Sequence, residues 1–210
     1  SMSFKKILFV ASLLFIWQNS FAQRNYRGYN LLGIQGGIAF FNIQTDDLVT
    51  EQRQGITAGF TTRGAFRNDF DLIYGLSFES ATIGVEGQNL LGTDTQNIGY
   101  TIQGVQLNLL GSYNIIVQHL SLEFGPVFGL NGKMKLDNDR FEDYILSGYN
   151  TLTAKEIQDI SKFNVRLAAG VTGGFEHFRI SAQYQYGLTN TLGALNEKGL
   201  ENNNFKGNSS

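Results

Sequence analysis

The sequence predicts an all-β fold, an antiparallel up-and-down β-barrel that crosses a membrane. Three observations lead to this prediction. Apolar and polar residues alternate through seven runs, the connections between the runs are long and short in turn, and the face opposite the apolar one is small and polar rather than highly charged. Alternation with a period of two is typical of strands, and the rhythm of connections is typical of membrane barrels.

The composition favours strands over helices. The 210 residues include 25 Gly, 17 Phe and 9 Tyr but only one Pro, and aromatic residues favour strands whereas Gly favours tight turns. Charged residues make up 16% of the chain, below the roughly 25% usual in soluble proteins. The net charge of −2 gives no electrostatic reason to expect a nucleic-acid partner. The chain has no cysteine, which excludes disulfides and thiolate metal sites.

The N-terminus has the organisation of a secretory signal. Two lysines at 5–6 precede an apolar run over 7–17, and small residues follow up to Ala22. This pattern predicts a signal peptide over 1–22 that is cleaved between Ala22 and Gln23. An N-terminal membrane anchor is the alternative, but the apolar run is shorter than the ~20 residues that a membrane-spanning helix needs.

The remaining residues, 23–210, are expected to form one barrel domain. Its strands are expected over 31–42, 54–66, 70–85, 99–117, 119–134, 162–176 and 177–190. Short turns fall at 67–69, 118–119 and 176–177, and long connections at about 43–53, 86–98, 135–161 and 191–206. A short helix is expected near 154–161, because Thr153 and Glu156 have the spacing of a capping box.

The polar face of the strands indicates which way the apolar face points. It consists mainly of Gly, Ser, Thr, Asn and Gln, whereas a soluble barrel would present Lys and Glu to water. Small residues with a few charges suit the interior of a narrow barrel, and bulky apolar residues suit lipid. Membrane lipid is therefore an expected partner of the outer face. A soluble β-sandwich or lipocalin-like barrel is the alternative.

Aromatic residues cluster where the strands are expected to meet the membrane interfaces. One girdle is expected beside the short turns, formed by Phe66, Phe70, Phe175 and Phe178. The candidates for a second girdle towards the long connections are Phe40, Phe41, Phe78, Tyr100 and Phe163.

Charged residues on the inward face must be paired if they are buried. We expect an interior polar network formed by Arg63, Glu79, Gln106, Glu123, Arg166, Arg179 and Gln183. The interior of an eight-stranded barrel is just wide enough for side chains to fill, so the network is expected to plug it. A narrow polar path for small solutes is the alternative.

The number of strands departs from the usual pattern. Membrane barrels of this kind have an even number of strands, from eight upward, but only seven runs precede the polar segment that ends in KGNSS. The expected fold is therefore of the eight-stranded type, with its final strand apparently missing from this chain.

No catalytic or cofactor chemistry is expected. Barrel enzymes of the outer membrane place a His or a Ser/His/Asp group at the outer rim, but His119 and His177 fall at predicted short turns. An acidic cluster over 137–143 offers oxygen ligands that Ca²⁺ accepts. It lacks the spacing and the Gly of an EF-hand, so a solvated loop is the preferred interpretation. No metal or cofactor is therefore predicted.

The signal ending in FAQ, the first strand LLGIQGGIAF, and the segments GITAGFTTRGAF and FDLIYGLSFES resemble the PorT-like outer-membrane β-barrel domain family of Gram-negative bacteria. The resemblance implies a small eight-stranded barrel, similar in shape to the OmpA and OmpX type, without catalytic residues. The namesake of the family takes part in protein secretion across the outer membrane.

Together these observations predict a non-enzymatic integral outer-membrane protein. Its N-terminus is expected in the periplasm and its long loops outside the cell. A structural or interaction role is expected, with other outer-membrane or periplasmic proteins as partners. A narrow porin-like channel for small solutes is the alternative.

Overall fold

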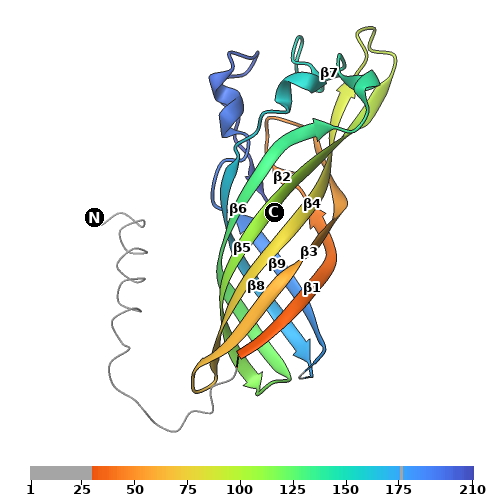
Figure 1. The fold of residues 1–210 in the computed structure, drawn as a ribbon. Coiled ribbons are helices and arrows are strands. Elements are labelled where there is room, and N and C mark those ends of the chain that lie inside the picture. The colour runs from red at the N-terminus through yellow and green to blue at the C-terminus, as the bar shows by residue number, and fades with distance from the viewer. Residues whose placement is uncertain (1–29, 176) are drawn as a thin grey trace, which may run out of the picture.

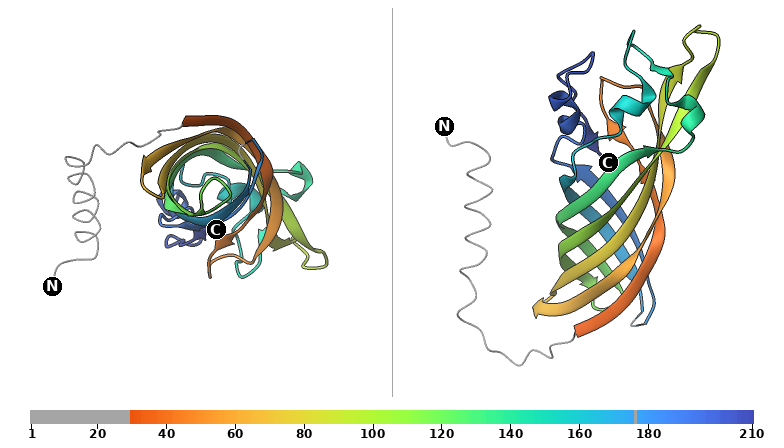
Figure 2. Two further views of the ribbon diagram at one scale, coloured as in Figure 1. Left: turned by 90° about the horizontal axis from the view of Figure 1, so that it is seen from below. Right: turned by 45° about the horizontal axis from the view of Figure 1, so that its top comes forward.

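Seven long strands curve around one axis in the computed structural model (Figures 1 and 2), which describes residues 30–175 and 177–210. The predicted signal peptide and its cleavage site lie outside the described residues. The strands are β1 (Asn30–Phe41), β3 (Thr50–Arg67), β4 (Phe70–Gln88), β5 (Thr95–Ile116), β6 (Leu120–Leu136), β8 (Phe163–Gly174) and β9 (Arg179–Gly187). Each is antiparallel to its neighbours, in the order β1-β3-β4-β5-β6-β8-β9. The predicted all-β, up-and-down fold is confirmed.

Three short connections lie at one end of the barrel, here called the short-turn end. Asn68 and Asp69 alone join β3 to β4, and residues 117–119 join β5 to β6. Asn68 and Gln118 have φ values of 50° and 62°, the left-handed conformation that reverses the chain tightly and that Asn adopts more readily than most residues.

The β4–β5 hairpin is longer than the sequence analysis predicted. Both strands continue beyond the expected ends at 85 and 99, so their connection is a loop of six residues, 89–94, rather than 86–98. The hairpin therefore projects beyond the rest of the barrel at the opposite, long-loop end (Figure 1).

Short elements occupy the long connections. They are β2 (Ile43–Gln44), β7 (Ile145–Leu146), β10 (Asn208–Ser209) and three 3₁₀ helices, η1 (Asp139–Phe141), η2 (Ala154–Ile157) and η3 (Gly193–Glu197). Strand β7 pairs with the end of β4, and β10 pairs with β2.

The helix predicted near 154–161 is the single turn η2. Its capping box forms, since the Thr153 N–H donates to Glu156 Oε2 at 2.8 Å. The helix ends early because the Gln158 carbonyl accepts a hydrogen bond from the Met134 N–H at 2.8 Å, so the chain runs along β6 instead of turning again. None of the helices in residues 30–175 and 177–210 has the length and apolar character needed to span a membrane.

Candidate functional site

The two faces of β4 exchange their character about halfway along the strand. Outward side chains are apolar and exposed from Phe70 to Phe78, and polar from Ser80 to Gln88. The inward side chains change in the opposite sense, from the buried Asp71 and Ser77 to the fully buried Ile83. The lower half of β4 therefore has the pattern of a membrane strand, and its upper half has the pattern of a water-exposed protein with an apolar core.

The neighbouring strands change at the same level. On β5 the outward side chains are polar from Thr95 to Gln103 and mainly apolar from Val105 to Ile115, and Gln103 pairs with Ser80 of β4. On β6 the apolar outward run ends at Leu130, just below the Gly104–Asn131 pair. The outward side chains below this level, which are mainly apolar, are here called the apolar band.

The apolar band has the height of a hydrocarbon layer. On β4 it covers the nine residues from Phe70 to Phe78. At about 3.3 Å per residue and a tilt of about 40°, nine residues rise about 23 Å. The apolar band of outer-membrane barrels is about 25 Å tall.

Aromatic side chains line the edge of this band at the short-turn end. Phe66, Phe70, Phe175 and Phe178 are all exposed, by 46%, 51%, 69% and 66%. Towards the other edge Phe40, Phe78 and Phe163 are exposed as well. The prediction of the second girdle was wrong for Phe41 and Tyr100, because both side chains point inward and are buried.

A buried ion cluster fills the interior near the short-turn end. Arg63 on β3 donates to Asp71 Oδ2 on β4 at 3.2 Å, to Ser112 Oγ on β5 at 2.8 Å, and to Glu123 on β6. Each of the three charged residues is less than a tenth exposed. One guanidinium therefore joins four adjacent strands and compensates two carboxylates that have little water around them.

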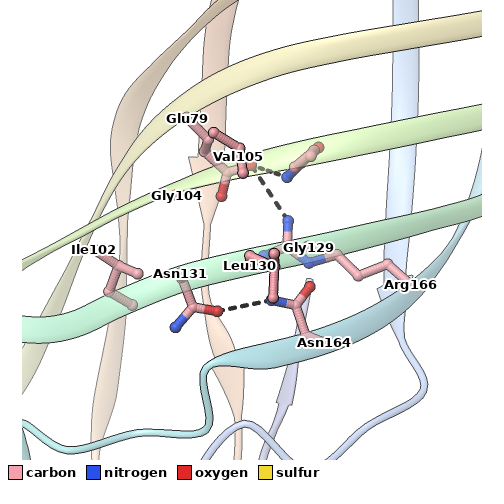
Figure 3. Close-up of a pocket in the computed structure, with 10 residues that line it drawn as sticks. Glu79, Ile102, Gly104, Val105, Gly129, Leu130, Asn131, Asn164 and Arg166 are labelled. Carbon is pink, nitrogen blue, oxygen red and sulfur yellow. Dashed lines mark hydrogen bonds and ion pairs between the residues drawn. The ribbon is translucent and has the colours of Figure 1, made fainter.

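A second polar cluster lies higher in the barrel, around Arg166 on β8 (Figure 3). Its Nη1 lies 3.4 Å from Glu79 Oε2 and 3.1 Å from Gln185 Oε1. Gln106 donates to the same Glu79 carboxylate, and Gln185 donates to Gln106 at 3.3 Å. On the other side, Arg166 Nε donates to Ser209 Oγ at 3.1 Å. The cluster connects β4, β5, β8, β9 and the C-terminal segment.

Apolar layers separate and cover these clusters. Between them lie Ile73, Leu110, Val127 and Ala168, which are at most 7% exposed. The cavity beside Glu79 and Arg166 has a volume of about 10 Å³, which is about the room that one water molecule needs. Side chains therefore leave little free space beside Glu79 and Arg166, whereas the inward Gln35 and Gln183 on β1 and β9 are exposed.

The long-loop end is closed by a larger apolar core, here called the cap. Strand residues such as Ile83, Ile98 and Met134 pack with loop residues such as Ile157 and Leu195, and all of these are fully buried. The cap thus uses the inward apolar side chains above the apolar band to hold the long connections together.

Comparison with known proteins agrees with this geometry. Residues 12–193 match the family model described as the outer membrane protein beta-barrel domain. The chain belongs to this family. No curated protein and no solved structure matches the chain. As a member of this barrel family the protein is placed in the outer membrane.

A carboxylate clamp ties two loops of this outer-membrane barrel together within the cap. Glu201 accepts hydrogen bonds from the backbone N–H groups of Asn150, Thr151 and Leu152, at 2.9, 2.7 and 3.0 Å. These donors favour the charged carboxylate, so they lower the pKa of Glu201 from 4.5 to about 2. The clamp joins the β6–β8 connection to the segment after β9.

The other predicted interior residues of the barrel lie on β9. Gln183 accepts a hydrogen bond from Gln185 at 2.8 Å, next to the Arg166 cluster. Arg179 is half-buried at the first residue of β9, where it pairs with Gly174 of β8.

Four partners in the interior clusters were not among the residues predicted for the network. Alternation places Asp71 and Ser112 on the inward face of their strands, but the predicted network did not include them. Gln185 lies two residues from Gln183 on the same face. No sequence pattern identified Ser209 as an interior residue, because it lies in a polar segment without the alternation of a strand.

The remaining polar residues considered from the sequence lie outside these clusters. His119 lies in the β5–β6 turn, with its ring 5.8 Å from that of Phe175, and His177 lies in the β8–β9 connection. Asp143 of the acidic loop pairs with Lys155 at 2.8 Å. Over the part of the chain that the structure describes, no three His, Asp or Glu side chains converge as metal ligands.

Proposed function

We propose that this outer-membrane barrel has a non-enzymatic role in binding other proteins, as a subunit of an outer-membrane assembly that makes contact through its long-loop end. The observation that carries the proposal is the combination of ion clusters inside the barrel with an ordered, apolar-cored cap. In such a molecule the long connections form an ordered surface and do not surround the entrance of a channel.

The tip of the β4–β5 hairpin offers a specific contact point. Leu90 and Leu91 are 79% and 84% exposed. They lie ten residues beyond Ser80, which corresponds to about 25 Å above the apolar band. Lipid therefore does not cover them, and adjacent exposed leucines on a soluble surface favour a protein contact.

The tip is also held in one shape. Asn89 Oδ1 accepts a hydrogen bond from the Thr93 N–H at 2.9 Å, and the Asn89 N–H donates to the Asp94 carbonyl at 2.9 Å. Gly92 adopts φ = +67°, which other residues adopt with strain. A preorganised loop loses less conformational entropy on binding.

The proposal includes the orientation of the barrel in the outer membrane and its membership of the PorT-like group. Short turns of bacterial barrels lie in the periplasm and long loops outside the cell, so the cap faces the exterior and β1 begins on the periplasmic side. The PorT-like resemblance, whose namesake takes part in protein secretion, supports a subunit role rather than a solitary one.

The channel hypothesis receives less support from the interior. A solute would have to pass both ion clusters, the layer around Val127 and the cap, and most side chains of these layers are buried. We therefore expect the protein refolded in planar bilayers to show no single-channel conductance above that of the bilayer alone. A stable, reproducible conductance would favour the channel instead.

Cross-linking in native outer membranes tests the interaction role. The wild type, a Leu90→Ser/Leu91→Ser variant and a Val49→Ser control are compared; Val49 is also exposed, by 51%, at the long-loop end. A protein that cross-links to the wild type and to the Val49→Ser control but not to the leucine variant supports the proposal. Equal cross-linking in all three, or none above an unrelated barrel of similar abundance, contradicts it.

A further inference from the structure

Three exposed lysines gather on the outer surface around β6, directly above the apolar band. Lys133 and Lys135 belong to β6 and point outward, since the Met134 between them is fully buried. Lys198 follows η3, and its ammonium group pairs with Asp159, the same carboxylate that Lys133 Nζ contacts at 3.0 Å. Lys133, Lys135 and Lys198 are here called the lysine patch.

The lysine patch carries more positive charge than its carboxylate partner compensates. Asp159 lies between Lys133 and Lys198, whose side chains are still 62% and 39% exposed. Within residues 30–175 and 177–210, Lys135 is exposed and forms no ion pair. Two exposed ammonium groups thus share one carboxylate and a third has none, so the patch keeps a net positive charge.

The strands on the other side of the patch carry no such excess. The outward residues of β5 beside the patch are the uncharged Gln103 and Thr101. The Thr101 hydroxyl donates to Asp137 Oδ1 at 2.6 Å, which turns this carboxylate of β6 toward β5. Arg53 on β3 pairs with Glu51 at 3.4 Å. The excess of positive charge therefore lies on the β6 side of the barrel and not on the β3–β5 side.

The height of the patch matches that of lipid headgroups. Leu130 on β6 and Val105 on β5 end the apolar band and pair with each other, and Lys135 pairs with Thr101. Gln103 and Thr101 lie two and four residues beyond Val105, so their levels are about 5 and 10 Å above the band. The headgroup region adds about 5–7 Å to each side of the hydrocarbon core. Because lysine carries its charge on a flexible stem that lies along apolar surface, the ammonium groups reach this region.

We propose that the lysine patch binds the headgroup of an anionic phospholipid in the leaflet at the long-loop end, with the acyl chains of that lipid along Leu130 and Phe163. These two side chains pair between β6 and β8 and are 58% and 53% exposed. Ammonium groups form charge-assisted hydrogen bonds with phosphate oxygens, and basic residues beside a membrane attract anionic lipids. A soluble acidic protein fits less well, because headgroups already occupy this level. The inference rests on the apolar band lying in the bilayer, and it does not depend on the protein contacts proposed for the hairpin tip.

Tryptophan reporters at the upper edge of the apolar band test this preference. Trp17→Phe removes the only tryptophan of the chain. A new tryptophan is then introduced by Phe163→Trp, below the patch, or by Phe78→Trp on β4, as the matched control. The two phenylalanines are exposed to a similar extent, by 53% and 49%. The proteins are folded in vesicles of phosphatidylcholine and phosphatidylglycerol in which either lipid carries brominated acyl chains, which quench a neighbouring tryptophan.

We expect brominated phosphatidylglycerol to quench the Phe163→Trp reporter preferentially. Its affinity relative to phosphatidylcholine should rise about fivefold for each ammonium group that the headgroup contacts. The Phe78→Trp reporter should show little preference between the two lipids. The preference should be lost, with quenching by brominated phosphatidylcholine retained, when the patch is neutralised by Lys133→Gln/Lys135→Gln/Lys198→Gln.

Equal preference at both reporters, or a preference that survives neutralisation of the patch, overturns the proposal. Quenching by both lipids without preference overturns it as well, but leaves the membrane position of the band intact; this is the result expected if the patch serves an acidic protein. Absence of quenching by either lipid contradicts the membrane position and the proposal together. Lys206→Gln, which removes an exposed lysine outside the patch, should keep the preference. A loss as large as that of the patch variant would assign the effect to total charge instead of the patch.

Discussion

Arg63 shows how single residues determine the interior of this barrel. Its guanidinium contacts Asp71, Ser112 and Glu123 from three other strands, and none of these partners is more than 8% exposed. Burying this cation alone would not stabilise the fold. It is needed because it pairs with two buried carboxylates, and buried charges are tolerated only when they are paired.

Replacing this cation should therefore destabilise the barrel strongly. We expect Arg63→Met to lower the free energy of unfolding by about 3–5 kcal/mol, because Asp71 and Glu123 are left as uncompensated buried charges. The measurement is urea unfolding in lipid vesicles, with Arg67→Met, at the exposed last residue of β3, as the control. The triple variant with Asp71→Asn and Glu123→Gln should recover most of the loss. An Arg63→Met effect no larger than that of Arg67→Met would contradict the role of the cluster.

Glu201 gives the cap a pH dependence of known sign. Its pKa is lowered from 4.5 to about 2, so the clamp contributes fully above about pH 4.5 and is lost as the pH falls towards 2. Hydrogen exchange, corrected for intrinsic rates, should show residues 150–152 protected at pH 7 in the wild type and less so in Glu201→Gln. The two proteins should converge at pH 2. Equal protection at pH 7 would show that the carboxylate does not hold the loop.

At the scale of elements, the exchange of faces along β4 and β5 determines which part of each strand can contact lipid. Leu109 and Gln103 point outward from the same strand, but Leu109 pairs with Tyr74 in the middle of the apolar band and Gln103 pairs with Ser80 above it. The two positions therefore form a matched pair for measuring where the band ends.

A lysine should be costly at one of these positions and tolerated at the other. We expect Leu109→Lys to reduce the stability of the folded barrel in vesicles by about 2–4 kcal/mol, the cost of a cation near the bilayer midplane. Gln103→Lys should change it by less than about 0.5 kcal/mol, as ordinary surface substitutions do. If both variants lose the same stability, the band extends above Ser80 and its assigned height is wrong.

The strands were predictable from the sequence where apolar outward and polar inward residues alternate along their whole length. Period-two alternation identified all seven and the inward phase of Arg63, Glu79 and Arg166. The same rule ended β4 at 85 and began β5 at 99, three and four residues short of the observed ends, because outward polar residues there look like the start of a loop when a membrane strand is expected. The contact between Arg166 and Ser209 could not be predicted either, since it joins residues 43 positions apart through a segment without a pattern.

At the scale of the whole molecule, the exchange of faces along β4 and β5 divides the barrel into two parts along its axis. The lower part has an apolar exterior and polar clusters inside, and the upper part has a polar exterior and the apolar cap inside. Figure 1 shows that β4 and β5 run without interruption through both parts. Because the boundary lies within the strands, the height of the apolar band, and not the length of the strands, determines how much of the barrel a bilayer covers.

This division predicts the bilayer in which the barrel is most stable. The apolar band rises about 23 Å, whereas the 19 residues of β4 would rise about 48 Å if the whole strand were embedded. Urea unfolding in vesicles of graded acyl-chain length should therefore show greatest stability at a hydrocarbon thickness near 23–25 Å. Thicker bilayers should reduce it by a fraction of a kcal/mol per Å of mismatch. Stability that keeps rising through membranes of ordinary thickness, about 30 Å, would show that the upper strands are embedded as well.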